Sequence, residues 1–491
     1  MRSLALIVAS GAAVLSVANP AHAADFVPGR VIVKWRTPDA ARLHATQLVF
    51  KRTMAANRAL VAVEPTREAT LAAVEALRAD PDVEYAEPDY VRTRSGDPMT
   101  PSDPLFAQQW ALPMIKAPAA WGDGFQGSGD ITVAIIDTGY VRHPEIADRI
   151  VGGYDFISDP NNAADGDGRD GDATDAGTSD DTSSALHGTH VAGIIAAQSN
   201  NAIGVAGLDW SCHLVIARAL GVTHGTGVDS DISDAIRWAA GIHVDGVPDN
   251  PHPADVINMS FGGTGYSQSM QDAVHDAISA GAIVVAAAGN LGIDAKGDSP
   301  AGLDGVITVG AVEESGSIAS YSNYGAVVAL MAPGGSPDRD PNSGTPMGVL
   351  STIEIAGSGY TYTFYAGTSQ AAPFVSGAVS LMRAVHPRLT AVEAKRILQA
   401  TADPSAKCAN PEDPTTDGCG AGLLDVDAAV TMAANADDIP GDPRLHNVVH
   451  GGFGCAVAGG RAPSSGALAL SIVAFALVAF ALVARRRRRV L

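Results

Sequence analysis

Hydrophobic and polar positions follow a repeating pattern over residues 110–432. Short, nearly continuous apolar runs predict strands that are buried on both faces, and the stretches between them predict covering helices. The clearest apolar runs are residues 131–136, 256–257, 282–288 and 306–312. Because buried strands that alternate with helices are typical of parallel sheets, we predict one large α/β domain with a mostly parallel sheet and helices on both faces.

Residues 26–93 show a different and shorter pattern. The apolar run at residues 31–33 and the alternation of apolar and acidic residues at 82–85 predict two strands. Between them, apolar residues recur at helical spacing and predict a helix over residues 67–78. These elements indicate a small α+β domain that precedes the larger one.

The N-terminus has the pattern of a secretory signal peptide. Arg2 provides a positive start, residues 4–17 form a short apolar run, and Ala21 and Ala23 provide the small residues that a signal peptidase recognises. We therefore predict a signal peptide over residues 1–23 and export of the remaining chain. An uncleaved anchor is the alternative interpretation.

The C-terminus combines an apolar segment with a basic cluster. Residues 467–484 contain no charged side chain and would span about 27 Å as a helix, which is close to the thickness of a bilayer core. The arginines at 485–489 would then stay on the cytoplasmic side. Together with the glycine-rich run at 451–455, this pattern resembles bacterial C-terminal sorting tags, which imply processing and delivery to the cell surface. A permanent membrane anchor is an equally good interpretation.

The composition narrows the class of function. With 32 Lys and Arg against 53 Asp and Glu, the formal net charge is −21, which argues against nucleic acid as a partner. Export brings the four cysteines into an oxidising compartment. Cys408 and Cys419 bracket a loop rich in Pro, Asp and Gly and are expected to form a local disulfide. Cys212 is expected to be a buried free thiol.

Three short motifs provide candidate groups for acyl transfer, which needs a nucleophile, a base, a group that orients the base, and donors for the oxyanion. Asp137 follows a buried strand, at the edge where α/β sheets place their chemistry. His187 opens a stretch of small residues that predicts a closely packed helix. Ser369 opens a helix whose apolar residues face the core. Taken singly, each motif also fits an ordinary turn, helix or cap.

Taken together, and in the order Asp, His, Ser, the motifs resemble those of the subtilisin-like serine protease family, also called subtilases or peptidase family S8. The resemblance covers about residues 110–430 and implies a subtilisin-like fold. It implies Ser369 as nucleophile, His187 as general base and Asp137 as the group that orients the histidine. The run at 287–290 resembles the family's oxyanion segment, which implies Asn290 as a side-chain donor beside the Ser369 backbone N–H.

Two segments resemble the family's substrate-binding elements. Residues 256–263 are similar to the strand that pairs with the substrate backbone, and such added-strand binding explains how one site accepts many sequences. The residues that the resemblance implies as substrate-binding are Ser260, Phe261, Gly262, Ala288 and Gly289. The first three would line the pocket for the residue before the cut bond.

Nine aspartates lie between Asp155 and Asp181. Calcium takes about six to eight oxygen ligands from flexible loops, and this stretch can supply them, although no Glu closes it in the pattern of an EF-hand. Because subtilases commonly bind calcium, the resemblance favours a structural Ca2+ here. The candidate ligands are Asp165, Asp167, Asp170, Asp172 and Asp175. A solvated acidic insertion is the alternative.

The small N-terminal domain resembles the inhibitor-like propeptide of subtilases, most clearly in its closing residues 84–90. The resemblance implies an intramolecular chaperone and inhibitor that is removed by self-cleavage between residues 91 and 103. An ordinary accessory domain is the alternative. The expected organisation is a signal peptide (1–23), a propeptide (24–100), a peptidase domain (101–432), a linker (433–463) and a transmembrane or sorting segment (464–491).

The resulting prediction is a monomeric serine endopeptidase, secreted or held at the cell surface. It would be made as a self-processed zymogen and would hydrolyse peptide bonds in proteins through an acyl-enzyme. A binding protein on an inactive protease scaffold is disfavoured because all three triad residues are present. A maturation protease of narrow specificity, like the kexin branch, would need acidic residues around the substrate pocket. The visible acid lies ahead of His187 instead, so broad specificity is favoured.

Overall fold

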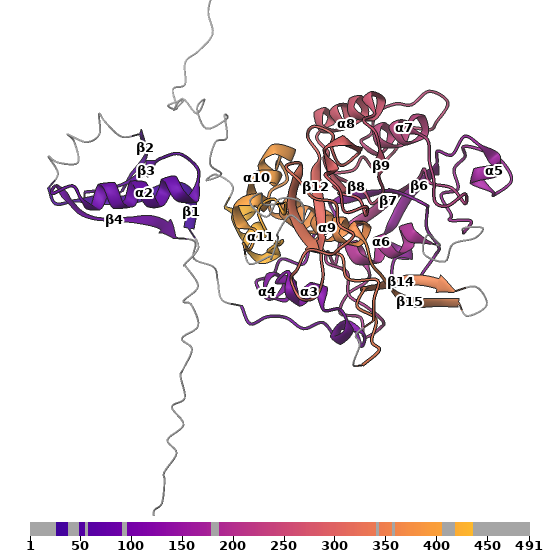
Figure 1. The fold of residues 1–491 in the computed structure, drawn as a ribbon, viewed down its shortest axis with the longest axis horizontal. Coiled ribbons are helices and arrows are strands. Elements are labelled where there is room, and N and C mark those ends of the chain that lie inside the picture. Colours follow the sequence, from indigo (N-terminus) through magenta and orange to yellow (C-terminus); the bar gives the residue numbers. More distant parts are fainter. Residues whose placement is uncertain are drawn as a thin grey trace, which may run out of the picture. The chain divides into compact units, whose positions relative to one another are not determined.

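The computed structural model describes residues 26–37, 49–54 (backbone only), 57–90, 96–177, 186–339, 343–355, 359–404 and 418–435, and the structural statements below refer to these residues. They form a small domain over residues 26–90 and a large domain from residue 96 onward, which are described separately (Figure 1). No helix in this part of the chain is long and apolar enough to cross a membrane. The predicted signal peptide, Cys408 and the apolar segment at 467–484 lie outside it.

The small domain is a four-stranded antiparallel sheet with one helix. Its elements are β1 (Phe26–Trp35), β2 (Val49–Met54), β3 (Arg58–Ala62), α2 (Arg67–Arg78) and β4 (Val83–Tyr90), with the sheet order β2-β3-β1-β4. Helix α2 has the bounds that the sequence predicts, and Thr66 caps it by accepting a hydrogen bond from Ala69 N at 3.1 Å. Val74 of α2 packs in one core with Val31 and Val33 of β1. The predicted α+β domain is therefore present.

A seven-stranded sheet forms the centre of the large domain, and all of its strands run parallel. In spatial order they are β13 (Val328–Pro333), β12 (Ile307–Val312), β10 (Ile283–Ala287), β8 (Val256–Met259), β5 (Thr132–Asp137), β7 (His213–Arg218) and β6 (Ile150–Asp155). The four apolar runs recognised in the sequence correspond to β5, β8, β10 and β12. Strands covered on both faces are apolar at every position, so they are recognisable from the sequence.

Helices cover both faces of the sheet (Figure 1). One layer contains α6 (His187–Ala196) and α9 (Thr368–Val385), and the other contains α7 (Asp229–Ala239) and α8 (Gln268–Ala280). Strand β5 contributes to both cores because its side chains alternate: Val133 and Ile135 pack with the first layer, and Ala134 and Ile136 with the second. The predicted α/β architecture is confirmed.

The remaining elements border this sheet. They are α3 (Ala111–Met114), α4 (Ala117–Gly122), α5 (Pro160–Ala163), α10 (Ala391–Thr401), α11 (Val426–Ala434), the 3-10 turns η1 (Phe106–Gln108), η2 (Ala147–Arg149) and η3 (Ala295–Gly297), the ribbon of β9 (Gly263–Thr264) and β11 (Asp298–Ser299), and the hairpin of β14 (Val349–Ile355) and β15 (Gly359–Tyr365). Cys212, just before β7, is a free thiol without exposed surface, as predicted.

Candidate active site

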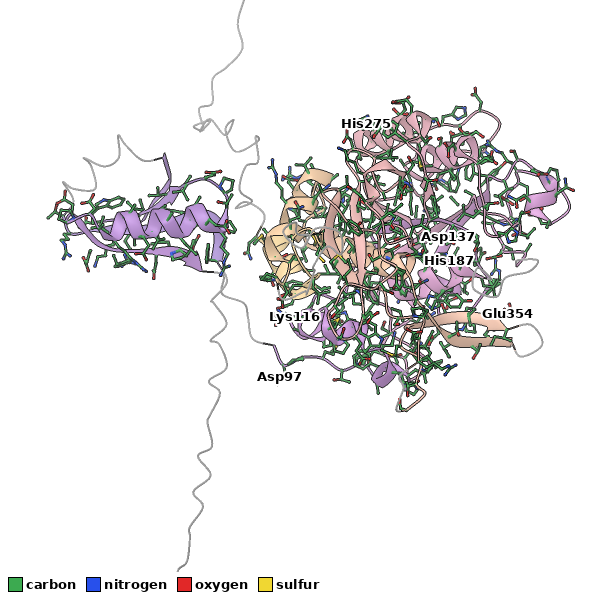
Figure 2. All side chains as sticks on the ribbon, viewed as in Figure 1. Asp97, Lys116, Asp137, His187, His275 and Glu354 are labelled. Atoms are coloured by element: carbon green, nitrogen blue, oxygen red, sulfur yellow. The ribbon has the colours of Figure 1, made fainter. Side chains whose placement is uncertain are left out.

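Asp137 and His187 meet where β5 ends and α6 begins. Asp137 is the last residue of β5 and has no exposed surface, and His187 is the first residue of α6. His187 Nδ1 lies 2.8 Å from Asp137 Oδ1 and 3.0 Å from Oδ2 (Figure 2). The backbone N–H of Thr138 donates to Asp137 Oδ1 at 2.8 Å. Because an ionised carboxylate only accepts hydrogen bonds, this contact keeps the proton on Nδ1 and leaves Nε2 as the basic nitrogen.

The electrostatics of this pair favour the protonated form of His187. Burial by itself lowers the pKa of His187, but the charge of Asp137, its hydrogen bond and the charge of Asp175 outweigh burial, so the pKa is raised above its ordinary value. His190, one turn further along α6, behaves differently. Its Nε2 lies 3.2 Å from the Thr363 carbonyl, and burial lowers its pKa to about 3, which gives it a structural role as a neutral side chain.

Ser369 is the second residue of α9, and its main chain is fixed by a chain of hydrogen bonds from the sheet. Ser260 Oγ donates to the Ser369 carbonyl at 2.8 Å, and Asn258 Nδ2 donates to Ser260 Oγ at 2.9 Å. Ser376, two turns further along α9, donates to Asn258 Oδ1 at 2.8 Å. The predicted substrate-binding segment is thereby tied to the helix that carries the predicted nucleophile.

Asn290 and the Ser369 backbone N–H border one common space. The Asn290 side-chain oxygen accepts hydrogen bonds from Thr368 N and Thr368 Oγ1, both at 2.8 Å, which turns its amide nitrogen away from Thr368. A Cβ added to Gly367 would lie 3.2 Å from Asn290 Nδ2 and 3.6 Å from Ser369 N. Both donors therefore adjoin the position that this Cβ would take, as does Gln370 Oε1, which lies nearest to it at 3.0 Å.

The two predicted substrate-binding segments lie beside these donors. Ala288 is buried, and its carbonyl accepts a hydrogen bond from Asn323 Nδ2 at 3.0 Å. Gly289 has a φ of +104°, and a Cβ there would lie 2.4 Å from Asn323 Nδ2, so only glycine fits this turn over the buried Asn323. On the other side, Ser260 is 2% exposed, Phe261 is half-buried and Gly262 is exposed.

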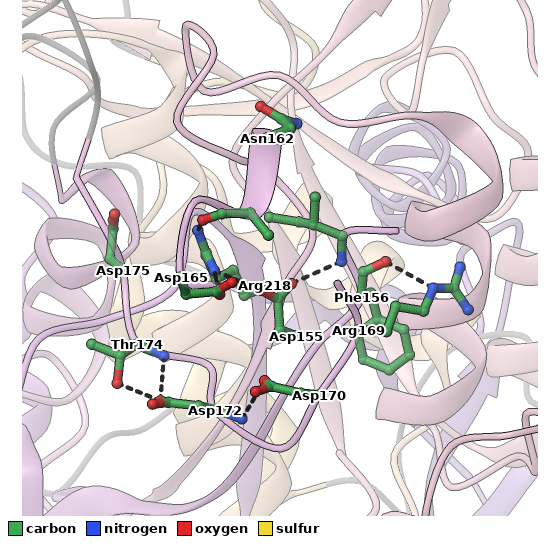
Figure 3. Close-up of polar contacts among 12 residues, drawn as sticks. Asp155, Phe156, Asn162, Asp165, Arg169, Asp170, Asp172, Thr174, Asp175 and Arg218 are labelled. Atoms are coloured by element: carbon green, nitrogen blue, oxygen red, sulfur yellow. Dashed lines mark hydrogen bonds and ion pairs between the residues drawn. The ribbon is translucent and has the colours of Figure 1, made fainter. Parts of the chain in front are cut away.

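Four of the five aspartates predicted to bind calcium, Asp165, Asp170, Asp172 and Asp175, have separate hydrogen-bond partners (Figure 3). Asp165 accepts a hydrogen bond from Arg218, Asp172 accepts from Thr174, and Asp175 accepts from Thr138 at 2.5 Å. Asp170 accepts from the backbone N–H of Asp172 at 2.8 Å. No group of three or more His, Cys, Asp or Glu side chains that could hold a metal ion occurs within the described ranges.

Arg218 pairs with one of the predicted calcium ligands, Asp165. It is 1% exposed, and its Nη1 donates to Asp155 Oδ2 at 2.6 Å and to Asp165 Oδ2 at 2.5 Å, while Nη2 donates to the Ala163 carbonyl (Figure 3). Burial raises the pKa of Asp155 to about 7, even though Arg218 lowers it. A permanently charged guanidinium therefore neutralises Asp155 and Asp165, of which only Asp165 is a predicted calcium ligand.

A pair of carboxylates that the sequence analysis did not select fits calcium better. Asp103 is 3% exposed and Glu145 is 1% exposed, and both contact the loop at 198–205: Asp103 accepts from Asn200 N at 2.6 Å, and Glu145 from Val205 N at 3.3 Å. Glu145 Oε1 is buried and makes no hydrogen bond of normal geometry to a described residue. Burial raises the pKa of Glu145 to about 7, and the charge of Asp103 adds to the rise. No local sequence motif marks these two isolated acids.

Comparison with known proteins gives consistent matches. The model of the Subtilase family matches residues 128–425, and the model of the fervidolysin N-terminal prodomain matches residues 12–89. The extracellular protease of Xanthomonas campestris is 42% identical over 377 residues, which are 73% of this chain and 61% of that protein. The extracellular basic protease of Dichelobacter nodosus is 37% identical over 423 residues, which are 80% of this chain and 66% of that protein.

Two further proteins extend the comparison. The thermophilic serine proteinase of a Bacillus species is 35% identical over 334 residues, which are 68% of this chain and 70% of that protein. A solved protease structure from Pseudoalteromonas arctica is 41% identical, with a TM-score of 0.62, and covers 68% of this chain and 100% of that one. The chain thus spans about two thirds or less of the length of the first two curated relatives.

Proposed function

Because this chain belongs to the subtilase family of serine proteases, we propose that it is a secreted serine endopeptidase that hydrolyses peptide bonds in proteins through an acyl-enzyme. The observation that carries the proposal is the Asp137–His187 pair, with Nδ1 at 2.8 Å from the buried carboxylate, in a family domain that also presents Ser369 and Asn290 around one space. Each group needed for acyl transfer is then available.

In the proposed reaction, His187 Nε2 removes the proton of the Ser369 hydroxyl as Ser369 Oγ attacks the substrate carbonyl carbon. Asp137 holds the imidazole in the required tautomer and stabilises the imidazolium that forms. The imidazolium then gives its proton to the leaving amine, and an acyl-Ser369 ester remains. Water deprotonated by the same His187 nitrogen attacks the ester and regenerates the free serine.

The negative charge of both tetrahedral intermediates would be stabilised by Asn290 Nδ2 and the Ser369 backbone N–H. Donors that are held in place before the reaction lower the barrier more than mobile ones, because they need no reorganisation when the charge forms. The two hydrogen bonds from Thr368 to Asn290 Oδ1 provide this restraint. Residues 260–262 and 288–289 would hold the substrate backbone as an added strand.

The small N-terminal domain is proposed to be an inhibitory propeptide and folding chaperone, which the enzyme removes from itself. The match of residues 12–89 to a protease prodomain supports this role. Secretion is proposed because relatives are named extracellular proteases and because the N-terminus has a signal-peptide pattern. A membrane anchor or sorting segment at 464–491, a Cys408–Cys419 disulfide and a monomeric state remain proposals from the sequence.

Subtilases commonly bind structural calcium, and we propose that Asp103 and Glu145 hold such an ion here rather than the aspartates at 165–175. Their buried carboxylates provide the hard oxygen ligands that calcium prefers. When bound, the ion would neutralise two buried acids and join residue 103, residue 145 and the loop at 198–205. It takes no part in the chemical step.

The first test is digestion of casein by the exported, matured protein beside a Ser369→Ala variant. We expect digestion that a serine-directed inhibitor blocks, and a loss of kcat of about 10^4-fold or more in the variant, because the nucleophile is removed. The circular dichroism of both proteins serves as the folding control. Equal rates for the wild type and Ser369→Ala, or a folded but inactive wild type, would contradict the proposal and favour a binding role for the scaffold.

A further inference from the structure

Asp298, in strand β11, is a carboxylate that the proposed reaction does not use. It is only 8% exposed, and its Oδ2 accepts a single hydrogen bond, from Asn323 Nδ2 at 3.0 Å. Within the described part of the chain, no Lys, Arg or His forms an ion pair with it. Burial raises the pKa of Asp298, and the charge of Asp294 adds to the rise, so the site as it stands disfavours the ionised acid.

The surroundings of Asp298 are the two substrate-binding segments. Asn323 Nδ2 donates to both the Ala288 carbonyl and Asp298 Oδ2, each at 3.0 Å, which joins Asp298 to the segment that ends in Asn290. In the β9–β11 ribbon, Asp298 pairs with Thr264 and Ser299 with Gly263. A Cβ on Gly262 would lie 3.7 Å from the Ser299 carbonyl. Asp298 therefore connects the segment at 260–264 with the segment at 288–290.

The residue before the cut bond must place its side chain near this connection. Its carbonyl oxygen lies between Asn290 Nδ2 and Ser369 N in the proposed reaction, and its side chain branches from the carbon next to that carbonyl. The main chain on one side of that carbon is Ala288-Gly289, and on the other side it is Ser260 to Gly262. A long side chain extending between these segments would approach the acid that joins them.

Resting on the proposed function, we propose that Asp298 gives this protease a preference for Arg or Lys as the residue before the cut bond. Asp298 Oδ2 is used by Asn323, and Oδ1 is the oxygen left to accept a charge-assisted hydrogen bond from the substrate. The substrate thereby supplies the cation that the protein lacks at this point. An acidic substrate side chain would meet like charge and be rejected.

This inference changes the specificity expected from the sequence. Broad specificity was favoured because the visible acid lies ahead of His187, yet the acid that borders the substrate segments is a single residue 36 positions after Gly262. It is brought there by the pairing of β9 with β11, a contact with no local sequence signal. The enzyme is accordingly proposed to be selective for the substrate residue before the cut bond. The neighbouring substrate residues would be bound through their backbone and would vary freely.

The test uses the matured enzyme and peptide substrates that are identical except for the residue before the cut bond: Arg, its neutral isostere citrulline, Lys, Phe and Glu. We expect kcat/KM for Arg to exceed that for citrulline by about 10- to 100-fold, the range typical of one charge-assisted contact. In Asp298→Asn this ratio should fall to within about threefold of unity, while hydrolysis of the Phe peptide is retained. Asn keeps an acceptor oxygen for Asn323, so the fold is preserved.

Asp294→Asn is the matched control, because it removes an exposed negative charge four positions away and keeps the side-chain oxygen that accepts from Lys296 N. It should leave the Arg-to-citrulline ratio well above unity, because the Asp298 carboxylate remains and is ionised at least as easily. A ratio near unity in the wild type, or one that Asp298→Asn leaves unchanged, would overturn the proposal. Absence of cleavage of every peptide, with Ser369→Ala indistinguishable from the wild type, would instead overturn the proposed function itself.

Discussion

At the scale of single residues, the proposed reaction depends on how closely main-chain segments approach one another. Gly367 precedes the helix that carries Ser369, and its missing side chain leaves open the space that Asn290 Nδ2 and Ser369 N share. Asn290 is held there by Thr368, and Gly289 allows the turn that leads into it. The proposed nucleophile and its proposed donors are therefore positioned by neighbours that take no part in the proposed chemistry.

The variant Gly367→Ala is expected to lower kcat about 100- to 1000-fold with little change in KM, because its Cβ would enter the oxyanion space. The backbone φ of 161° is extended and accepts alanine, so the melting temperature should change little. Steady-state kinetics with one peptide substrate measure kcat and KM for Gly367→Ala, for Asn290→Ala and for the double variant. Since both changes act on one oxyanion, the double variant should lose much less than the product of the two single losses. Full additivity would contradict a shared site.

At the scale of secondary-structure elements, strand β7 stabilises the acidic stretch that follows β6. Arg218 is the last residue of β7 and is the register partner of Asp137 on β5 and of Asp155 on β6. Its two carboxylate contacts and its contact with the Ala163 carbonyl attach the acidic stretch to the edge of the sheet that holds Asp137. An internal cation thus neutralises Asp155 and Asp165 at the start of this stretch.

Arg218→Met should destabilise the protein by about 3 kcal/mol or more near pH 8, because it leaves two carboxylates without their buried partner. The loss should be smaller at pH 5, where Asp155, whose pKa is about 7, is protonated and uncharged. Thermal unfolding at pH 8 and at pH 5 measures the two losses of stability. The measurements use the Ser369→Ala background, where autolysis does not contribute.

The matched control is Arg237→Met, whose partner Asp276 is half exposed, so that this ion pair should contribute no more than about 1 kcal/mol. Added calcium should not rescue Arg218→Met. A rescue by calcium, or a loss no larger than that of Arg237→Met, would show that the guanidinium does not organise this stretch.

At the scale of the whole molecule, the large domain joins distant parts of the chain through a few buried polar contacts. Asp103 and Glu145 are 42 positions apart and both contact the loop at 198–205. In the absence of a cation this pair is costly, because burial and the charge of Asp103 both disfavour the ionised form of Glu145. A bound calcium ion would remove that cost and hold the three segments together.

Calcium should raise the melting temperature of the Ser369→Ala protein by about 5 °C at saturation, and more at pH 8 than at pH 5. The sign follows from Glu145: its pKa is raised to about 7 from 4.5, so without metal its contribution to stability falls as the pH rises through this interval. Calcium binds the ionised Glu145 carboxylate and thereby offsets the stability that is lost when Glu145 is deprotonated. Glu145→Gln should abolish the calcium effect, whereas Asp172→Asn should leave it intact. If Asp172→Asn abolished the calcium effect and Glu145→Gln left it intact, the ion would instead bind the acidic stretch.

The sequence by itself determined the layers of the fold and the candidates for catalysis. Strands such as β5 and β12 are buried on both faces, so their apolar runs are local signals, and the approximate bounds of helix α2 were predicted from its periodicity. The motifs around Asp137, His187 and Ser369 are also local, because each residue stands where one element meets the next.

Only the tertiary structure decided where the acidic residues act. Arg218 reaches Asp165 because β6 and β7 are neighbours, Asp298 reaches the substrate segments because β9 pairs with β11, and Glu145 approaches Asp103 through a shared loop. These contacts join residues that are far apart in the chain. Charge acts through space rather than along the sequence, so a count of nearby aspartates could not reveal that Asp165 pairs with Arg218.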